Sequence, residues 1–288
     1  NTGVIDENLF KAQETRRILD RIAGFTTSPY VSKCFGNNLS AGRVQSAALK
    51  LITDRESAID NFVPEKFWTI DVKLEKNKEK FAAKYDSKLS EEANAKATFS
   101  KFKNTSTYEV SSVVFDDKKE FPQAPFITST MQQYCASTHK LTPSDTMAAA
   151  QKLYESGLIT YHRTDSLRAG EEPMEELRKF IKKSEYPLST KTVVYKNKDA
   201  AQDAHECIRP SDITVSDISS EITDSNAKKV YKAIYDHFMM SQMAPAVFST
   251  VKIVLISKED ATCQVKITGK MLKDKGYLAY SGKIPTGS

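Results

Sequence analysis

The chain has 288 residues, of which 40% are hydrophobic and 27% are charged, and its formal net charge is +5. This length allows two or three domains of ordinary size, and the composition excludes a disordered or fibrous protein. No apolar run approaches the roughly 20 residues of a membrane helix and no secretory signal opens the chain, so we expect a cytoplasmic protein without membrane contact. The mild positive charge permits nucleic-acid binding without requiring it.

Two helices are predicted before the first strand pattern. In residues 6–23 apolar side chains recur at spacings of three, four and seven, which is the period of a helix, and Gly24 supplies a stop signal. The second helix is predicted from Ser40, a good N-cap residue, to about Asn61, and Pro64 follows its end. The face of the first helix opposite the apolar stripe carries Arg16, Arg17 and Arg21.

Strand patterns lie on both sides of a long helical stretch. Apolar and polar residues alternate from Trp68 to Leu74, and "YEVSSVVF" has the same texture. After Pro125 the pattern is helical to about Met243, and strands return in "FSTVKIVLI" and "TCQVKIT". The simplest explanation is a β domain whose chain is interrupted by a helical domain. We therefore predict an α+β, multidomain chain that divides into residues 1–62, 63–119, 120–245 and 246–288.

The helical stretch begins with two helices joined by a tight turn. "PFITSTMQQYCASTHK" and "LTPSDTMAAAQKLYESG" are each predicted as one helix. In the second, Thr142 is the N-cap, Pro143 takes the first helical position and Gly157 closes the C-terminus. Residues 158–161 are then predicted as a short strand. Two helices followed by a strand in this order resemble a winged helix-turn-helix.

The stretch "GLITYHRTDS" places a tyrosine and an arginine two positions apart. In an extended chain Tyr161, Arg163 and Asp165 project to one side, and Thr160 and His162 face the other. A guanidinium beside a tyrosine can hold a phosphodiester with two donors, stabilise charge on the phosphorus oxygens and help the phenolate form. Because an aryl phosphate has a good leaving group, such an attack is reversible without ATP. The alternative is a tyrosine that packs at a strand end.

Four motifs occur in the order of one enzyme family. They are "AQETRRILDRIAG", "LSAGRVQSAALKLITDRESAIDNFVPEKFW", "FITSTMQQYCASTHKLTPSDTMAAAQKLYESGLITYHRTDS" and "AQDAHECIRPSD". Over nearly the whole chain they resemble the type IA DNA topoisomerases, and most closely bacterial topoisomerase I. The resemblance implies a toroidal, clamp-like enzyme that cuts one DNA strand through a 5′-phosphotyrosine link, passes another strand and reseals the gap, relaxing negative supercoils. Residues 1–62 would then be part of a helical gate domain with a single-strand groove, 63–119 and 246–288 a β arch domain, and 120–245 an inserted winged-helix-like domain.

The resemblance also assigns roles to individual residues. Tyr161 would be the nucleophile, and Arg163 would position it and stabilise the transition state. His205 would contact a phosphate near the scissile one, with a capping or buried histidine as the alternative, and Arg209 would be structural or would contact DNA. The residues expected to line the single-strand groove are Arg16, Arg17, Asp20, Arg43, Gln45 and Ser46. Small residues before Arg43 would let a DNA backbone approach the helix N-terminus, where free N–H groups favour an anion.

Some features of the sequence depart from the family. His162 stands where bacterial topoisomerase I usually has Met, which bears on the subfamily and not on the reaction. Cys207 stands where Ala is usual, and we expect it to be tolerated in the packing. The family's Toprim domain supplies an acidic cluster for Mg²⁺, and "FDDKKE" lacks the alternation suited to such a cluster. The chain opens without Met, so we expect a piece of a longer protein that alone binds single-stranded DNA weakly and cannot cleave it efficiently.

The expected partner is single-stranded DNA or negatively supercoiled duplex DNA, with no small-molecule substrate, and the enzyme is expected to be a monomer. Three alternatives remain open. Within the same class, the chain could be the core of reverse gyrase or topoisomerase III. A winged-helix DNA-binding protein without catalysis would explain residues 132–157 but not the other motifs. A structural β module, in which Tyr161 is incidental, is the third.

Overall fold

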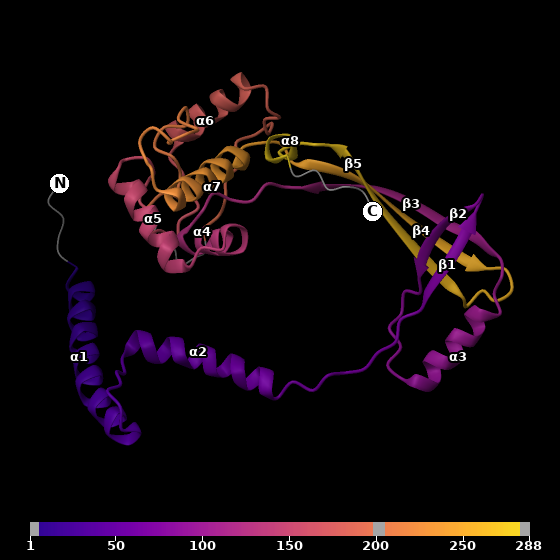
Figure 1. The fold of residues 1–288 in the computed structure, drawn as a ribbon, viewed down its shortest axis with the longest axis horizontal. Helices are drawn as coiled ribbons and strands as arrows, with labels where there is room; N and C mark the ends of the chain where they lie inside the picture. Colours follow the sequence, from indigo (N-terminus) through magenta and orange to yellow (C-terminus); the bar gives the residue numbers. More distant parts are fainter. Residues whose placement is uncertain (1–5, 198–204, 283–288) are drawn as a thin grey trace. The chain divides into compact units, whose positions relative to one another are not determined.

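The computed structural model describes residues 6–197 and 205–282. The chain divides into two compact units, Asn1–Phe67 and Trp68–Ser288. The first unit is helical, and the second holds one antiparallel sheet together with the remaining helices, so the fold is α+β (Figure 1). Among the described residues, no helix combines the length and the apolar character needed to cross a membrane.

The first helix, α1 (Glu7–Phe35), is longer than predicted. The Asp6 side chain caps it by accepting two backbone N–H groups of the first turn. The helix runs through Gly24 and ends where Gly36 adopts a φ of 68°. The predicted stop at Gly24 was wrong because a glycine inside a helix costs only about 1 kcal/mol relative to alanine, whereas the left-handed residue after a helix strongly favours glycine.

The second helix, α2 (Arg43–Asp60), begins later than predicted. The predicted cap at Ser40 was wrong, since the N-cap is Gly42, which has extended backbone and no side-chain cap. The chain before it is bound to α1: the Ser28 hydroxyl donates to the carbonyl of Ala41 at 3.1 Å and accepts its N–H at 3.0 Å. The Ala41 carbonyl thus accepts from Ser28 where a helix would have it accept a helical N–H, and the first backbone bond of α2 runs from the N–H of Ser46 to the carbonyl of Gly42.

Five strands of the second unit form one antiparallel sheet in the order β1-β2-β5-β4-β3. The strands are β1 (Asp71–Lys76), β2 (Glu79–Lys84), β3 (Tyr108–Glu120), β4 (Ala246–Ser257) and β5 (Gln264–Asp274). Figure 1 shows the yellow strands β4 and β5 beside the purple strands, although they are far apart in the sequence. The chain leaves the sheet at Glu120 and returns at Ala246, its register partner. The four predicted strand segments are confirmed.

A short hairpin joins β1 to β2, and a helix that was not predicted follows it. Asn77 and Lys78 turn the hairpin with φ values of 53° and 69°. The helix α3 (Glu92–Lys103) buries only Ala95 and Phe102. Because so few of its side chains are buried, the sequence carries no continuous apolar stripe that would have revealed the helix.

The remaining helices pack around one core. They are α4 (Thr128–Tyr134), a π-helical turn η1 (Cys135–His139), α5 (Pro143–Glu155), α6 (Glu171–Lys183), α7 (Ser225–Ser241) and α8 (Leu278–Ser281). The side chains of Tyr231, Ile234 and Phe238 in α7 are almost fully buried. They share a cluster with Met131 of α4 and Leu153 of α5. The α4–α5 pair that precedes the tyrosine loop therefore rests on α7.

The observed bounds of α4 and α5 can be compared with those of the two helices predicted before the tyrosine. Thr142 caps α5 by accepting the N–H of Asp145, and Gly157 follows the helix with a φ of 73°, so both predictions are confirmed. The helix before it was predicted as one element to residue 140. It instead changes to a π-helical turn at Cys135 and ends at Lys140, whose φ is 57°.

Candidate active site

The loop that carries Tyr161 is extended but is not a strand. The strand predicted over residues 158–161 was wrong, since only Ile159 forms an isolated bridge, with Pro210, and a proline has no N–H with which to extend a ladder. The predicted alternation is confirmed. Exposed side chains are those of Tyr161, Arg163 and Asp165, and buried ones are those of His162, Thr164 and Ser166. The tyrosine and the arginine therefore share the solvent side of the loop.

Thr128, the first residue of α4, pairs with this loop in place of a neighbouring strand. Its hydroxyl donates to the carbonyl of His162 at 2.8 Å and accepts the N–H of Thr164 at 3.0 Å. Its own N–H donates to the carbonyl of Thr164 at 3.0 Å. These bonds fix the loop on both sides of Arg163. Sequence reasoning missed Thr128, because a threonine near a helix start also suits an ordinary cap.

Three rings surround the side chain of Tyr161. Its ring centroid lies 5.3 Å from that of Tyr154, 5.5 Å from that of His162 and 5.6 Å from that of His205. The contacts with Tyr154 and His162 are edge-to-face, with ring planes at 65°, and the contact with His205 is tilted at 54°. Edge-to-face contacts favour one ring orientation. The structure thus brings His205 to Tyr161. Tyr154, near the end of α5, was not predicted to lie here.

The side chain of Arg163 is available to a ligand. It is exposed, and within the described part of the chain it makes no hydrogen bond or ion pair. A guanidinium carries five N–H donors in a planar fork that matches a phosphate. Arg163 can therefore offer two parallel donors to an anion on the side of the loop that carries Tyr161.

The side chain of His162 lies beneath the loop and is fully buried. Neither of its ring nitrogens has a hydrogen-bond partner among the described residues. Burial lowers the pKa of His162, the nearby charge of Arg163 lowers it further, and Glu155 opposes this with a smaller effect. A buried imidazole of this kind is neutral, so the folded state resists its protonation.

We expect the folded protein to lose stability as the pH falls below about 6.5, the ordinary pKa of histidine. In that range the unfolded chain binds a proton that the folded chain, with its lowered pKa at His162, does not, so acid favours unfolding. His162→Leu should weaken this dependence. Thermal unfolding between about pH 5 and 8 measures it, with His205→Gln as the control. The same pH dependence in wild type and His162→Leu would contradict the assignment.

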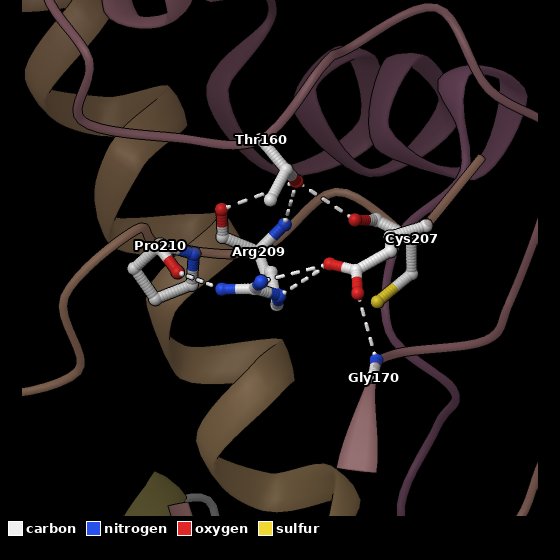
Figure 2. A network of polar contacts seen from close by, with 6 residues as sticks. Thr160, Gly170, Cys207, Arg209 and Pro210 are labelled. Carbon is white, nitrogen blue, oxygen red and sulfur yellow. Dashed lines mark hydrogen bonds and ion pairs between the residues drawn. The ribbon is translucent and has the colours of Figure 1, made fainter. Parts of the chain in front are cut away.

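A polar network joins two loops beside the tyrosine (Figure 2). The N–H of Thr160 donates to the carbonyl of Arg209 at 2.9 Å, and its hydroxyl donates to the carbonyl of Cys207 at 2.8 Å. Glu206 accepts the N–H of Gly170 at 2.8 Å and two guanidinium nitrogens of Arg209 at 2.8 and 2.9 Å. Because the Arg209 side chain is only 14% exposed, this ion pair favours its structural role. A DNA contact by Arg209 stays a prediction.

In the first unit, two of the predicted groove residues form an ion pair. The Arg43 Nε donates to a carboxylate oxygen of Asp20 at 2.6 Å. A Cβ atom added to Gly42 would lie 2.7 Å from the side-chain oxygen of Gln45, so the glycine allows Gln45 to fold over the start of α2. A pocket of about 320 Å³ lies beside this pair and is also lined by Ser46. The other two groove residues, Arg16 and Arg17, are exposed on α1.

The described residues contain no group of three or more His, Cys, Asp or Glu side chains that could hold a metal ion. The acidic residues of "FDDKKE" lie in β3, where Asp117 is ion-paired with Lys273 and Glu120 with Lys270. Carboxylates neutralised by lysines in a sheet do not fit a Mg²⁺ site, which needs converging oxygen ligands. We therefore assign no metal ligand to the described residues.

Comparisons with known proteins agree with the four motifs. The family described as DNA topoisomerase matches residues 4–287. DNA topoisomerase 1 of Campylobacter jejuni is 38% identical over an alignment of 303 residues, gaps included, and the alignment covers 99% of this chain and 43% of that protein. The proteins of the same name from Vibrio cholerae and Buchnera aphidicola are each 39% identical, over 96% and 89% of this chain and 32% and 31% of their own lengths.

Among solved structures, full-length topoisomerase I from Thermotoga maritima matches 96% of this chain with a TM-score of 0.77 and 33% identity, and the match covers 46% of that protein. The chain thus spans less than half of the length of each of these relatives. The family match covers nearly every residue and includes both helices of the first unit, the sheet and the tyrosine loop. The chain therefore belongs to the type IA DNA topoisomerase family, and these relatives are bacterial topoisomerases I.

Proposed function

We propose that this chain carries the nucleophile of an ATP-independent enzyme that relaxes negatively supercoiled DNA by transient cleavage of one strand. One observation supports this above all others. In a member of the family, Tyr161 and Arg163 are exposed on the same side of an extended loop that Thr128 holds in place. A tyrosine buried for packing would not leave 39% of its surface exposed beside a guanidinium that has no partner among residues 6–197 and 205–282.

The proposed reaction is a transesterification at phosphorus. The phenolic oxygen of Tyr161 attacks a backbone phosphate, a bond forms between that oxygen and phosphorus, and the bond to the 3′ oxygen of the preceding nucleoside breaks. The phenol gives up its proton, and the departing 3′ oxygen takes one. Each step replaces one phosphodiester with another, so resealing by the 3′ hydroxyl needs no ATP. Two donors from Arg163 stabilise the negative charge that develops on the phosphorus oxygens.

His205 is proposed to contact a neighbouring phosphate. Its ring lies 5.6 Å from that of Tyr161, and it is partly exposed, so it can reach a DNA strand laid across the tyrosine. Such a contact would hold the backbone in register for attack. The capping or buried alternative for His205 is less favoured, because a fully enclosed ring would not line the same surface as Tyr161.

The first unit is proposed to bind single-stranded DNA. Arg43 stands at the first position of α2, where backbone N–H groups favour an anion, and a pocket lies beside it. The proposed contacts also include Arg16, Arg17, Gln45 and Ser46. Asp20 is proposed to orient Arg43 through the 2.6 Å ion pair and not to contact the DNA itself.

The larger architecture is a proposal drawn from the family. Residues 1–62 would belong to a helical gate domain, 63–119 and 246–288 to a β arch, and 120–245 to an inserted winged-helix-like domain, within a toroidal clamp. The pairing of Glu120 with Ala246 supports the insertion, because the sheet is continuous across it. We further propose a DNA-associated, cytoplasmic monomer without a small-molecule substrate.

Mg²⁺ is proposed as the cofactor, with its ligands in a Toprim domain as in the family and not among the described residues. When bound, it would help to hold the DNA backbone for cleavage and resealing. The residues of this chain would supply the nucleophile, the guanidinium and the single-strand contacts.

Two other readings are less favoured. Reverse gyrase and topoisomerase III share the reaction, but the relatives compared above carry the name DNA topoisomerase 1. A winged-helix DNA-binding protein without catalysis would bind DNA through α4 and α5, and this function would not explain why Tyr161 and Arg163 are exposed together. Preference for duplex over single-stranded DNA, with a salt dependence spread over many phosphates, would favour that second reading.

A covalent-capture experiment tests the proposed function. The full-length protein is mixed with labelled single-stranded DNA and Mg²⁺, denatured, digested with a protease and analysed by mass spectrometry. We expect one modified peptide, carrying a 5′-linked nucleotide on Tyr161. The 288-residue chain alone is expected to bind the same DNA weakly and to form little adduct. A nucleotide on another tyrosine, or none on any, would overturn the proposal.

A further inference from the structure

The segment that begins at His205 is bound to three other parts of the chain. The N–H of Cys207 donates to the carbonyl of Arg168 at 2.6 Å, and the N–H of Ile208 donates to the carbonyl of Phe126 at 2.8 Å. The carbonyl of Arg209, the next residue, accepts the N–H of Thr160. The side chains of Cys207 and Ile208 are fully buried. The backbone of residues 207–209 is therefore fixed, and His205 lies two residues before it.

The carboxylate of Glu206, the residue after His205, is held by bonds to both of its oxygens. One of its oxygens accepts the N–H of Gly170, the residue before α6, and the other accepts the guanidinium of Arg209 (Figure 2). Arg209 also donates to the carbonyl of Pro210 at 3.1 Å, which limits its freedom to turn away. One oxygen of Glu206 thus binds another segment at Gly170, and the other binds Arg209 within its own segment.

From this geometry we propose that Glu206 is a positioning residue, which sets the place of the His205 ring beside Tyr161 through its bonds to Gly170 and Arg209. The proposal rests on the proposed function of Tyr161 as nucleophile. Glu206 does not contact the tyrosine ring in this arrangement. It acts through the backbone, because it is the chain neighbour of His205 and is itself held on two sides.

Gly170 provides a second, independent sign that the position of this carboxylate matters. A Cβ atom at residue 170 would lie 2.8 Å from the Glu206 oxygen that accepts its N–H. The φ of Gly170 is −59°, which any residue adopts, so the backbone does not require glycine. The Glu206 carboxylate, at the far end of its side chain, would instead have to shift to make room for a Cβ atom. Gly170→Ala would therefore displace the carboxylate and leave every charge in place.

Glutamine is the sharpest replacement for Glu206. In Glu206→Gln the side-chain oxygen could still accept one N–H, but the new amide group is a donor and would face the donors of Arg209. Arg209 is largely enclosed and would lose its carboxylate partner. Aspartate keeps the charge on a shorter side chain and should restore part of the arrangement. Glu175→Gln, which removes an exposed carboxylate paired with Lys179, is the matched control.

The first experiment follows the His205 ring by NMR in the 288-residue chain, and it requires no enzymatic activity. The chain has four histidines, and His205→Gln assigns the signal of interest. We expect Glu206→Gln and Gly170→Ala each to shift the His205 ring signals, because the ring moves relative to Tyr161, and Glu175→Gln to leave them in place. Unchanged His205 signals in folded Glu206→Gln or Gly170→Ala would overturn the proposal.

The second experiment measures covalent adduct formation by the full-length protein in a single turnover with saturating single-stranded DNA. We expect Glu206→Gln and Gly170→Ala to lower the rate by about 10- to 100-fold, the usual cost of a small misplacement, with DNA affinity unchanged and partial rescue by Glu206→Asp. If the rate falls only in proportion to the fraction of folded protein, Glu206 stabilises the fold and does not position His205, and the proposal is wrong. Adduct formation by Tyr161→Phe would instead refute the proposed function and leave the NMR result standing.

Discussion

Tyr161→Phe in the full-length protein is expected to lower the rate of covalent DNA capture by on the order of 10⁴- to 10⁶-fold, the loss typical of removing a catalytic nucleophile. The substitution deletes one oxygen atom and keeps the ring, so the three ring contacts at 5.3, 5.5 and 5.6 Å can remain. Affinity for single-stranded DNA should change little. Gel separation of labelled DNA after denaturation measures the adduct, and a binding titration measures the affinity.

Tyr154→Phe is the control for this experiment. Tyr154 is 41% exposed and Tyr161 is 39% exposed, and their rings are in edge contact, so the two substitutions remove the same group from nearly the same surface. We expect Tyr154→Phe to retain adduct formation. If it loses as much as Tyr161→Phe does, the reaction depends on the pair of hydroxyls, and the assignment of a single nucleophile is wrong.

Arg163→Ala is expected to lower the rate of adduct formation by about 10²- to 10³-fold, the range found when a donor that stabilises transition-state charge is removed. Arg163 is not engaged in any ion pair or hydrogen bond within the described residues, so its loss should cost little folding stability. Arg163→Lys keeps the charge but loses the planar fork, and it should recover only part of the rate. Single-turnover kinetics at saturating DNA separates this effect from binding.

Lys179→Ala serves as the control for Arg163, since it removes an exposed cation of α6 that is ion-paired with Glu175. It should leave the rate unchanged. A full rescue by Arg163→Lys would mean that charge alone is needed at this position and that bidentate contact is not. A loss of DNA affinity that accounts for the whole effect of Arg163→Ala would mean that Arg163 binds the substrate without stabilising the transition state.

The sequence was most informative where local chemistry decides the structure. Thr142 and Gly157 bound α5 as expected, because a cap and a left-handed residue act within a few positions of the helix end. The alternation around Tyr161 also held, although the strand did not form. An extended chain alternates its side chains whatever its hydrogen-bond partners are.

Local signals failed where a partner distant in the sequence decides the outcome. Ser40 looked like a cap, but Ser28 holds the chain before α2 in an extended form. Thr128 and Glu206 hold parts of the candidate site together, yet Thr128 bonds residues 34 and 36 positions away and Glu206 bonds Gly170, 36 positions away. A pattern in one segment cannot report such a contact. The roles proposed for Tyr161 and Arg163 rest on the resemblance of four ordered motifs, because spacing alone also fits a packed tyrosine.

The pairing of β3 with β4 leaves the length of the chain between these two strands free to vary. Glu120 and Ala246 are register partners, so the helical residues enter and leave the sheet at one hairpin position. Lengthening or shortening the excursion between them changes no strand register, in the way that a loop tolerates insertion. The tyrosine-bearing part can thus change in length while the sheet keeps its pairing, provided that the contact of Tyr280 in α8 with Asp236 in α7 is kept.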